Sequence, residues 1–183
     1  LEDVDKAIEI DQSYAIAYAL KADIFYFDIG GSASQTKKML NNAFELSPDN
    51  PFVNFVKGDF HYDDAFILYD KGKIDLAIKS AEKALIHFQK VVDNSKNNKD
   101  LIIKRIYPLG ITYTATAILG EAKFELYFMY KDIKDRKTAK TYLEEALSHY
   151  TNAISMAPSQ EKAEEIELDR DFDLITPADL YTE

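Results

Sequence analysis

The stretch Gly72–Leu85, GKIDLAIKSAEKAL, constrains the fold of this chain more than any other part of the sequence. Gly72 marks a turn, and Ala77, Ala81 and Ala84 then recur at spacings of four and three residues. In a helix, this spacing places three small side chains in one row. Because nothing bulky holds the two backbones apart, the row predicts a second helix packed closely against this one.

The same arrangement recurs along the chain. A small residue followed by a short run of apolar and acidic residues and a turn occurs four times, as KAIEIDQ, NAFELSP, KALIHFQ and NAISMAP. The alanines that mark the four copies lie 36, 41 and 69 residues apart, at Ala7, Ala43, Ala84 and Ala153. Four copies in order indicate an internal repeat, which in a helical chain is typical of a stacked array.

This pattern resembles the tetratricopeptide repeat family, whose unit is a helix pair with alanines in the second helix and a proline that closes it. Other residues that fit the first helix of such a unit are Tyr18, Ala22, Phe25, Gly58 and Gly120. The resemblance covers residues 1–158 and implies an all-α fold, a solenoid of about seven to eight helices in antiparallel pairs. The chain opens inside what reads as a second helix, so the first repeat is expected to lack its first helix.

Turn and cap residues divide the chain into expected helices. These cover 2–11, 14–28, a stretch from a Ser32 or Ser34 cap to 46, 51–70, 73–93, a sixth helix ending near 131, and 136–156. The polar run 93–100 is the expected loop. Residues 159–169 predict a polar helix that caps the array, and 170–183 predict an acidic tail without helical periodicity.

Charge and composition exclude several classes of function. The net charge of −10 disfavours nucleic acid and anionic membranes as partners. The absence of cysteine excludes disulfides and thiolate chemistry. The apolar stretch 106–130 contains Glu121, Lys123 and Glu125, each costing about 2.5–3.5 kcal/mol at a bilayer centre, so it predicts a buried helix rather than a membrane span. The compartment stays open, with a cytoplasmic location as the default and an extracytoplasmic one as the alternative.

No catalytic signature is present in the sequence. It contains no glycine-rich phosphate loop, no nucleophile elbow and no His–Glu pair at zinc-binding spacing. His61 and Asp64 are three residues apart and come nearest to a metal pair, but the three histidines stand in different helices without a partner motif. We therefore expect no enzymatic activity, no metal and no cofactor.

The resemblance implies that the first helix of each pair lines a concave surface. The candidate partner-binding residues on that surface are Asp23, Tyr26, Phe27, Phe55, Asp59, Tyr62, Glu121 and Phe124. A carboxylate takes the equivalent place three times, each time among aromatic rings. Chaperone-binding members of the family hold a carboxylate there with lysine, arginine and asparagine. No such clamp is expected here, because those places hold Ile16, Ala19, Phe52, Phe55 and Ala117.

These features predict a non-enzymatic scaffold or adaptor that binds a basic or amphipathic peptide or protein. Aromatic rings provide contact area at a low entropy cost, and carboxylates select for cations. The alternative is a carrier of a small apolar ligand, held in a pocket among Phe55, Tyr62, Phe124 and Phe128. An extracytoplasmic accessory subunit of a transport system fits either function. Self-association through the N-terminal edge of the array is a further expectation.

Overall fold

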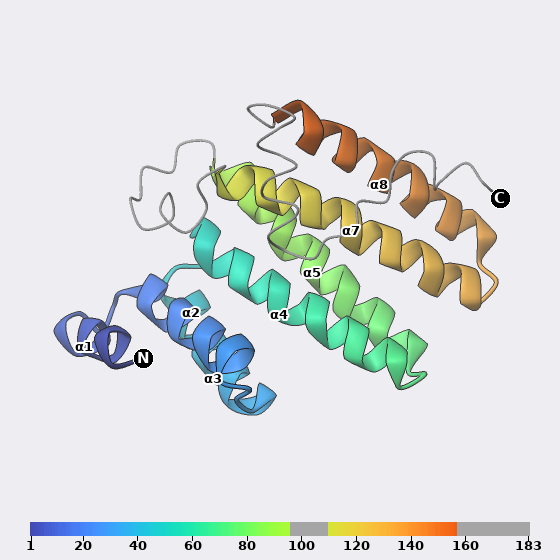
Figure 1. Cartoon of the computed structure of the whole chain (residues 1–183). Helices are drawn as coiled ribbons and strands as arrows, with labels where there is room; N and C mark the ends of the chain where they lie inside the picture. Colours follow the sequence, from blue (N-terminus) through green and yellow to red (C-terminus); the bar gives the residue numbers. More distant parts are fainter. Residues whose placement is uncertain (96–109, 157–183) are drawn as a thin grey trace.

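In this computed structural model, the described parts of the chain, residues 1–95 and 110–156, fold into helices and contain no strand (Figure 1). The elements are α1 (Glu2–Ile10), α2 (Ala15–Asp23), the π-helical turn η1 (Ile24–Asp28), α3 (Ala33–Leu46), α4 (Pro51–Asp70), α5 (Ile74–Asn94), α7 (Ile111–Asp132) and α8 (Arg136–Met156). The predicted all-α fold is confirmed. The expected capping helix at 159–169, the tail at 170–183 and most of the 93–100 loop lie outside the described residues.

Local signals place several helix boundaries where the sequence predicts them. The Ser32 hydroxyl oxygen caps α3 by accepting a hydrogen bond from the Gln35 amide at 3.3 Å. The Asn50 side chain caps α4 by accepting from the Phe52 amide at 2.9 Å, and Pro51 follows at the first helical position. None of the described helices combines the length and the apolar character that a membrane crossing requires.

The second helix differs from the expected 14–28. It stops being α-helical at Asp23 and widens into η1, where the Ile29 amide donates to the Ile24 carbonyl at 3.1 Å. The chain then turns tightly at Gly31, where an added Cβ would lie only 2.1 Å from the Phe25 ring. A π turn shifts the direction of every side chain after it, so η1 decides where Tyr26 and the ring beside it point.

Two long hairpins, α4–α5 and α7–α8, form the larger part of the molecule (Figure 1). In the first, Gly58 lets the two backbones approach, since an added Cβ would lie 2.7 Å from the Phe88 ring. In the second, Gly120 faces the Tyr150 ring, and an added Cβ would lie 3.1 Å from that ring. Helix α5 packs against α7, and α2 packs against both α3 and α4, so the hairpins and the N-terminal helices are joined side by side.

The two hairpins repeat one another at a constant offset of 62 residues. Gly58 corresponds in this way to Gly120, and the ring that meets each glycine lies 30 residues further on. The turn between the helices has a left-handed residue at Gly72 in one hairpin (φ 69°) and at Lys134 in the other (φ 63°). The residue equivalent to Ala84 is consequently Ala146. The repeat pattern in the sequence had paired Ala84 with Ala153 instead.

The core lies where these helices meet. The alanine row of α5 is buried, with Ala77, Ala81 and Ala84 each at most 1% exposed. Two buried clusters result, one centred on Phe52, Phe88 and Leu119, the other on Ala65, Leu126 and Met129. Helix α1 stands apart, because it packs on α2 and contains no buried residue.

We expect Gly58→Ala to destabilise the fold, although alanine favours a helix over glycine by about 1 kcal/mol. The added methyl group would collide with the Phe88 ring, and overpacking of this kind costs about 1–3 kcal/mol. Urea unfolding should therefore show a lower free energy of unfolding. Gly120→Ala is the matched control, since its looser contact predicts a smaller loss or a gain. Equal stabilisation by both substitutions would contradict the close approach.

Candidate functional site

A cluster of carboxylates and phenols lies where α4 meets α7. It consists of Asp59, Tyr62, Glu121, Glu125 and Tyr150, called here the acid–tyrosine cluster. Tyr62 is half-buried, and its pKa is raised by burial and by the charges of Glu121, Glu125 and Asp59. The pKa of Tyr150 is raised by burial and by the same two glutamates. Both phenols therefore remain neutral hydrogen-bond donors at physiological pH.

Helical spacing explains why the carboxylates gather. Asp59 and Asp63 are four residues apart on α4, and Glu121 and Glu125 are four apart on α7, so each pair shares one helix face. The 62-residue offset relates the two pairs. Like charges at this spacing repel, and burial raises the pKa of Glu125. Keeping the Glu125 carboxylate charged in this position therefore costs free energy, which a cationic group bound there would lower.

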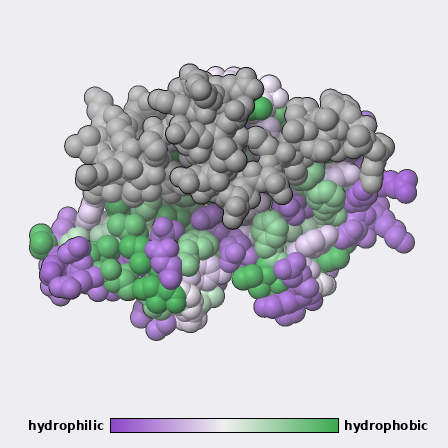
Figure 2. All heavy atoms as spheres, in the orientation of Figure 1, coloured by the Kyte–Doolittle hydropathy of each residue, from purple (hydrophilic) through white to green (hydrophobic). Residues whose placement is uncertain are grey.

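The turn η1 is linked to α4 through Tyr26. Its hydroxyl donates to the Asp63 carboxylate at 2.6 Å. Its ring packs edge-on against the rings of Phe60 and Phe27, with ring centres 5.1 Å and 4.8 Å apart. Phe27 is 44% exposed. Figure 2 shows hydrophobic side chains reaching the surface over the N-terminal helices, next to hydrophilic ones.

Asp23, at the end of α2, is half-buried beside Asp28. Burial, and secondarily the Asp28 charge, raise its pKa from about 3.8 to about 6. No described lysine, arginine or histidine forms an ion pair with Asp23. The charged form of a carboxylate that is partly buried beside another carboxylate is stabilised by any cation that reaches it.

The eight predicted residues fall into three groups. Asp59, Tyr62 and Glu121 come together in the acid–tyrosine cluster, while Tyr26 and Phe27 adjoin it through Asp63. Asp23 lies at the end of α2, where its charged neighbour is Asp28. The rings of two others are buried and give little accessible area, Phe55 at 5% exposed and Phe124 at 8%.

The sequence analysis did not include three residues that lie in or next to the acid–tyrosine cluster, namely Asp63, Glu125 and Tyr150. Asp63 and Glu125 were recoverable, because each lies one helical turn after a predicted carboxylate. Tyr150 was not recoverable in this way, since it comes from α8 and reaches the cluster only through the α7–α8 packing at Gly120.

A second group of polar residues lies between α4 and α5. The rings of His61 and His87 stack with centroids 5.8 Å apart. The Asn54 amide nitrogen donates to the carbonyls of Pro48 and Asn50, so its oxygen accepts, at 3.0 Å, from Nδ1 of His87. Burial, and then nearby lysines, lower the pKa of both histidines to about 4, which keeps them neutral at pH 7. Within the described residues, no three metal-binding side chains converge on one point.

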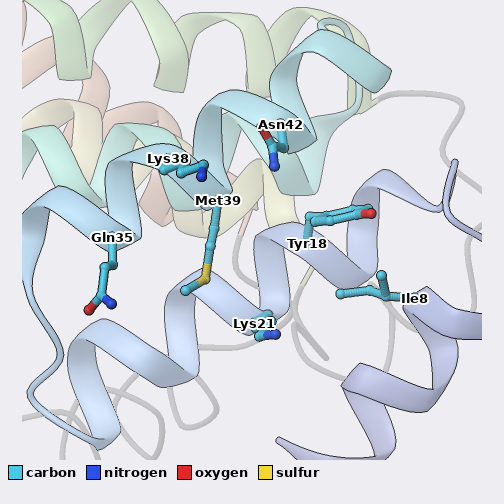
Figure 3. A pocket seen from close by; sticks show the side chains of 7 residues that line it. All are labelled: Ile8, Tyr18, Lys21, Gln35, Lys38, Met39 and Asn42. Carbon is cyan, nitrogen blue, oxygen red and sulfur yellow. The ribbon is translucent and has the colours of Figure 1, made fainter.

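A pocket of about 350 Å³ opens between α1, α2 and α3 (Figure 3). Ile8 and Met39 point into it beside the Tyr18 ring, and its polar rim is made by Lys21, Gln35, Lys38 and Asn42. Asp5 of α1 pairs with Lys21 at 2.5 Å and so holds α1 against α2. This pocket lies away from the place where the sequence predicted an apolar cavity, among Phe55, Tyr62, Phe124 and Phe128.

No protein-family profile, curated protein or solved structure matches this chain. What the surface does is therefore inferred from its geometry and charge. Carboxylates beside neutral phenols bind cationic groups through charge-assisted hydrogen bonds, and the adjoining rings contribute apolar contact.

We expect Asp23→Asn to stabilise the protein at pH 7.5. The folded-state pKa of about 6 exceeds the unfolded value, so the stability present below about pH 4 is lost as the pH rises through 6. The free energy of unfolding should rise by about 1–2 kcal/mol at pH 7.5 and change little at pH 4, since one pKa unit corresponds to about 1.4 kcal/mol. Urea unfolding at both pH values measures this. Asp28→Asn is the control and should give a smaller gain, because it removes only the secondary cause.

The histidine pair predicts the opposite pH dependence. Its folded-state pKa values lie below the ordinary value of 6.5, so stability present above pH 6.5 is lost as the pH falls toward 4. We expect His61→Gln to reduce this acid-dependent loss by about 1–2 kcal/mol, judged from the same conversion of pKa to free energy. NMR titration of the imidazole protons tests the cause directly, and midpoints of 6 or higher for both rings would contradict it.

Proposed function

We propose that this chain is a non-enzymatic scaffold that binds a basic or amphipathic peptide or protein on an aromatic and acidic surface. The surface is formed by α2, η1, α4 and α7. The observation that carries the proposal is the acid–tyrosine cluster, in which Tyr62 stands among Asp59, Glu121 and Glu125 from two helices. Carboxylates held together in partly buried positions favour a cationic partner over a neutral or anionic one.

The fold that we propose for this role is a tetratricopeptide-like solenoid of antiparallel helix pairs. Three observations support it: the two hairpins related by 62 residues, the glycines at the closest helix approach, and the buried alanine rows. A 36-residue offset further relates Asp23 to Asp59 and Tyr26 to Tyr62, in line with the family's spacing of about 34 residues. The 62-residue unit is longer, which lengthens the helices and enlarges the surface that each pair presents.

Exposure and hydrogen bonding suggest different roles for the individual residues. Phe27 and Tyr26 supply an apolar anchor point beside Asp63. The carboxylates of the cluster orient the partner and speed its association. Phe55 and Phe124 are buried, so their contribution is to hold α4 and α7 in place.

A carrier of a small apolar ligand is the second candidate. The pocket between α1, α2 and α3 favours it, because its apolar floor of Ile8, Tyr18 and Met39 is ringed by polar groups (Figure 3). Its two lysines, Lys21 and Lys38, suit a ligand with an apolar body and an anionic end.

Affinity capture from a native cell extract with three baits tests the scaffold proposal. The baits are the unchanged chain, Asp23→Asn with Asp59→Asn, and a control with Asp49→Asn and Asp70→Asn. All the replacements are isosteric, and the two pairs change the net charge equally. The control carboxylates are exposed: Asp49 lies in the turn before α4, and Asp70 is the last residue of α4.

We expect a partner retained by the unchanged and control baits and reduced at least about ten-fold on the Asp23/Asp59 variant, as for loss of close charge pairs. Equal retention by all three baits would rule out this surface as the binding site. Native mass spectrometry that finds a bound small molecule and no captured protein would instead support the carrier, and Met39→Lys should then abolish the bound mass.

A further inference from the structure

The face of α5 opposite its buried alanines carries an ordered stripe. Leu76, Lys79, Lys83, Ile86 and Lys90 follow one another at alternating spacings of three and four residues, which puts them in one line along the helix. Leu76 is 50% exposed and Ile86 is 60% exposed. The opposite face of α5 is the buried alanine row, so the core does not account for these two apolar side chains.

Further lysines from α3 and α4 border the stripe. The Lys57 ammonium lies 4.1 Å from the centre of the Phe44 ring, and the Lys90 ammonium lies 5.2 Å from the same centre. The pKa of Lys57 is lowered by burial and then by the charges of Lys37 and Lys90. The stripe, with Lys37, Lys57 and Phe44, is called here the basic face.

Within the described residues, the lysines of the basic face outnumber the carboxylates that act on it, which are Glu45 beside Lys57 and Asp64 beside His61. Lys37, Lys57, Lys83 and Lys90 form no ion pair with any carboxylate there. This concentration of cations occurs in a chain whose net charge is −10. Like charges that outnumber their counter-charges attract an anionic partner, and the gain is largest where exposed apolar side chains are covered at the same time.

We propose that the basic face docks an acidic amphipathic helix of a partner protein, which lies along α5. The alternation of three and four is the spacing with which one helix meets another, with side chains of each fitting between those of the other. A partner helix with apolar residues opposite Leu76 and Ile86 and carboxylates opposite the lysines would cover the apolar side chains and pair with the charges. An extended polyanion would pair with the lysines and leave the apolar residues in water.

This docking is independent of the proposed scaffold surface. Helix α4 separates the two, because it carries Asp59 and Asp63 on one side and Lys57 and His61 on another. A protein with both surfaces binds two partners of opposite charge without competition between them.

The test is fluorescence anisotropy with a labelled peptide of three heptads. Leucine and glutamate follow the spacing of the stripe on one of its faces, and alanine and glutamine fill the remaining positions. A scrambled peptide of the same composition is the second probe. The protein variants are Lys83→Glu with Lys90→Glu, Ile86→Ser, and a control with Lys137→Glu and Lys140→Glu on the exposed side of α8.

We expect the periodic peptide to bind the unchanged chain and the α8 control alike, and the Lys83/Lys90 variant at least about ten-fold more weakly. Ile86→Ser should weaken binding about three-fold or more, as expected for loss of a buried apolar contact. Absence of binding, equal binding to all the variants, or equal binding of the scrambled peptide would overturn the proposal.

A second copy of this chain is the competing occupant, because α1 is itself acidic and carries the 87% exposed Ile10. Sedimentation of the unchanged chain without peptide distinguishes the two. Self-association that disappears in the Lys83/Lys90 variant would show that the basic face binds another copy, and would overturn the assignment to a different protein.

Discussion

The close approach of paired helices is the constraint on which the rest of this structure depends. Gly58 beneath Phe88 and Gly120 beneath Tyr150 set the separation within each hairpin, and the buried alanines of α5 and α8 keep it small along the helices. Interiors are packed at nearly crystalline density, so a methyl group added at such a point must move a ring or a backbone. The position of α7 beside α4, and hence the grouping of their carboxylates, follows from this packing.

Packing also decides which charges meet. The middle of helix α4 carries Lys57 and His61 as well as Asp59, Asp63 and Asp64, and its sequence alone gives them no common partner. In the folded chain, Asp59 and Asp63 turn toward α7 and η1, while Lys57 and His61 turn toward α3 and α5. Two surfaces of opposite charge result on one molecule. Each concentrates like charge, and for that reason each would gain free energy from a complementary partner.

Local rules explain much of the fold prediction and fail at identifiable points. Caps at Ser32 and Asn50 and the turn at Gly72 are set by neighbouring residues, and all three were predictable. The π turn after Asp23, which precedes the tight turn at Gly31 beneath Phe25, was not predicted. The left-handed conformation of Lys134 was not predicted either, because lysine does not favour a positive φ.

The sequence by itself determined the all-α fold, the close-packed alanine row and the repetition of a carboxylate at Asp23, Asp59 and Glu121, because helical periodicity fixes which residues share a face. Only the tertiary structure decided which faces meet. It placed Tyr150 of α8 beside Glu121, buried Phe55 and Phe124, stacked His61 on His87, and left Leu76 and Ile86 exposed among lysines. These outcomes depend on contacts between residues distant in the chain, which local periodicity does not encode.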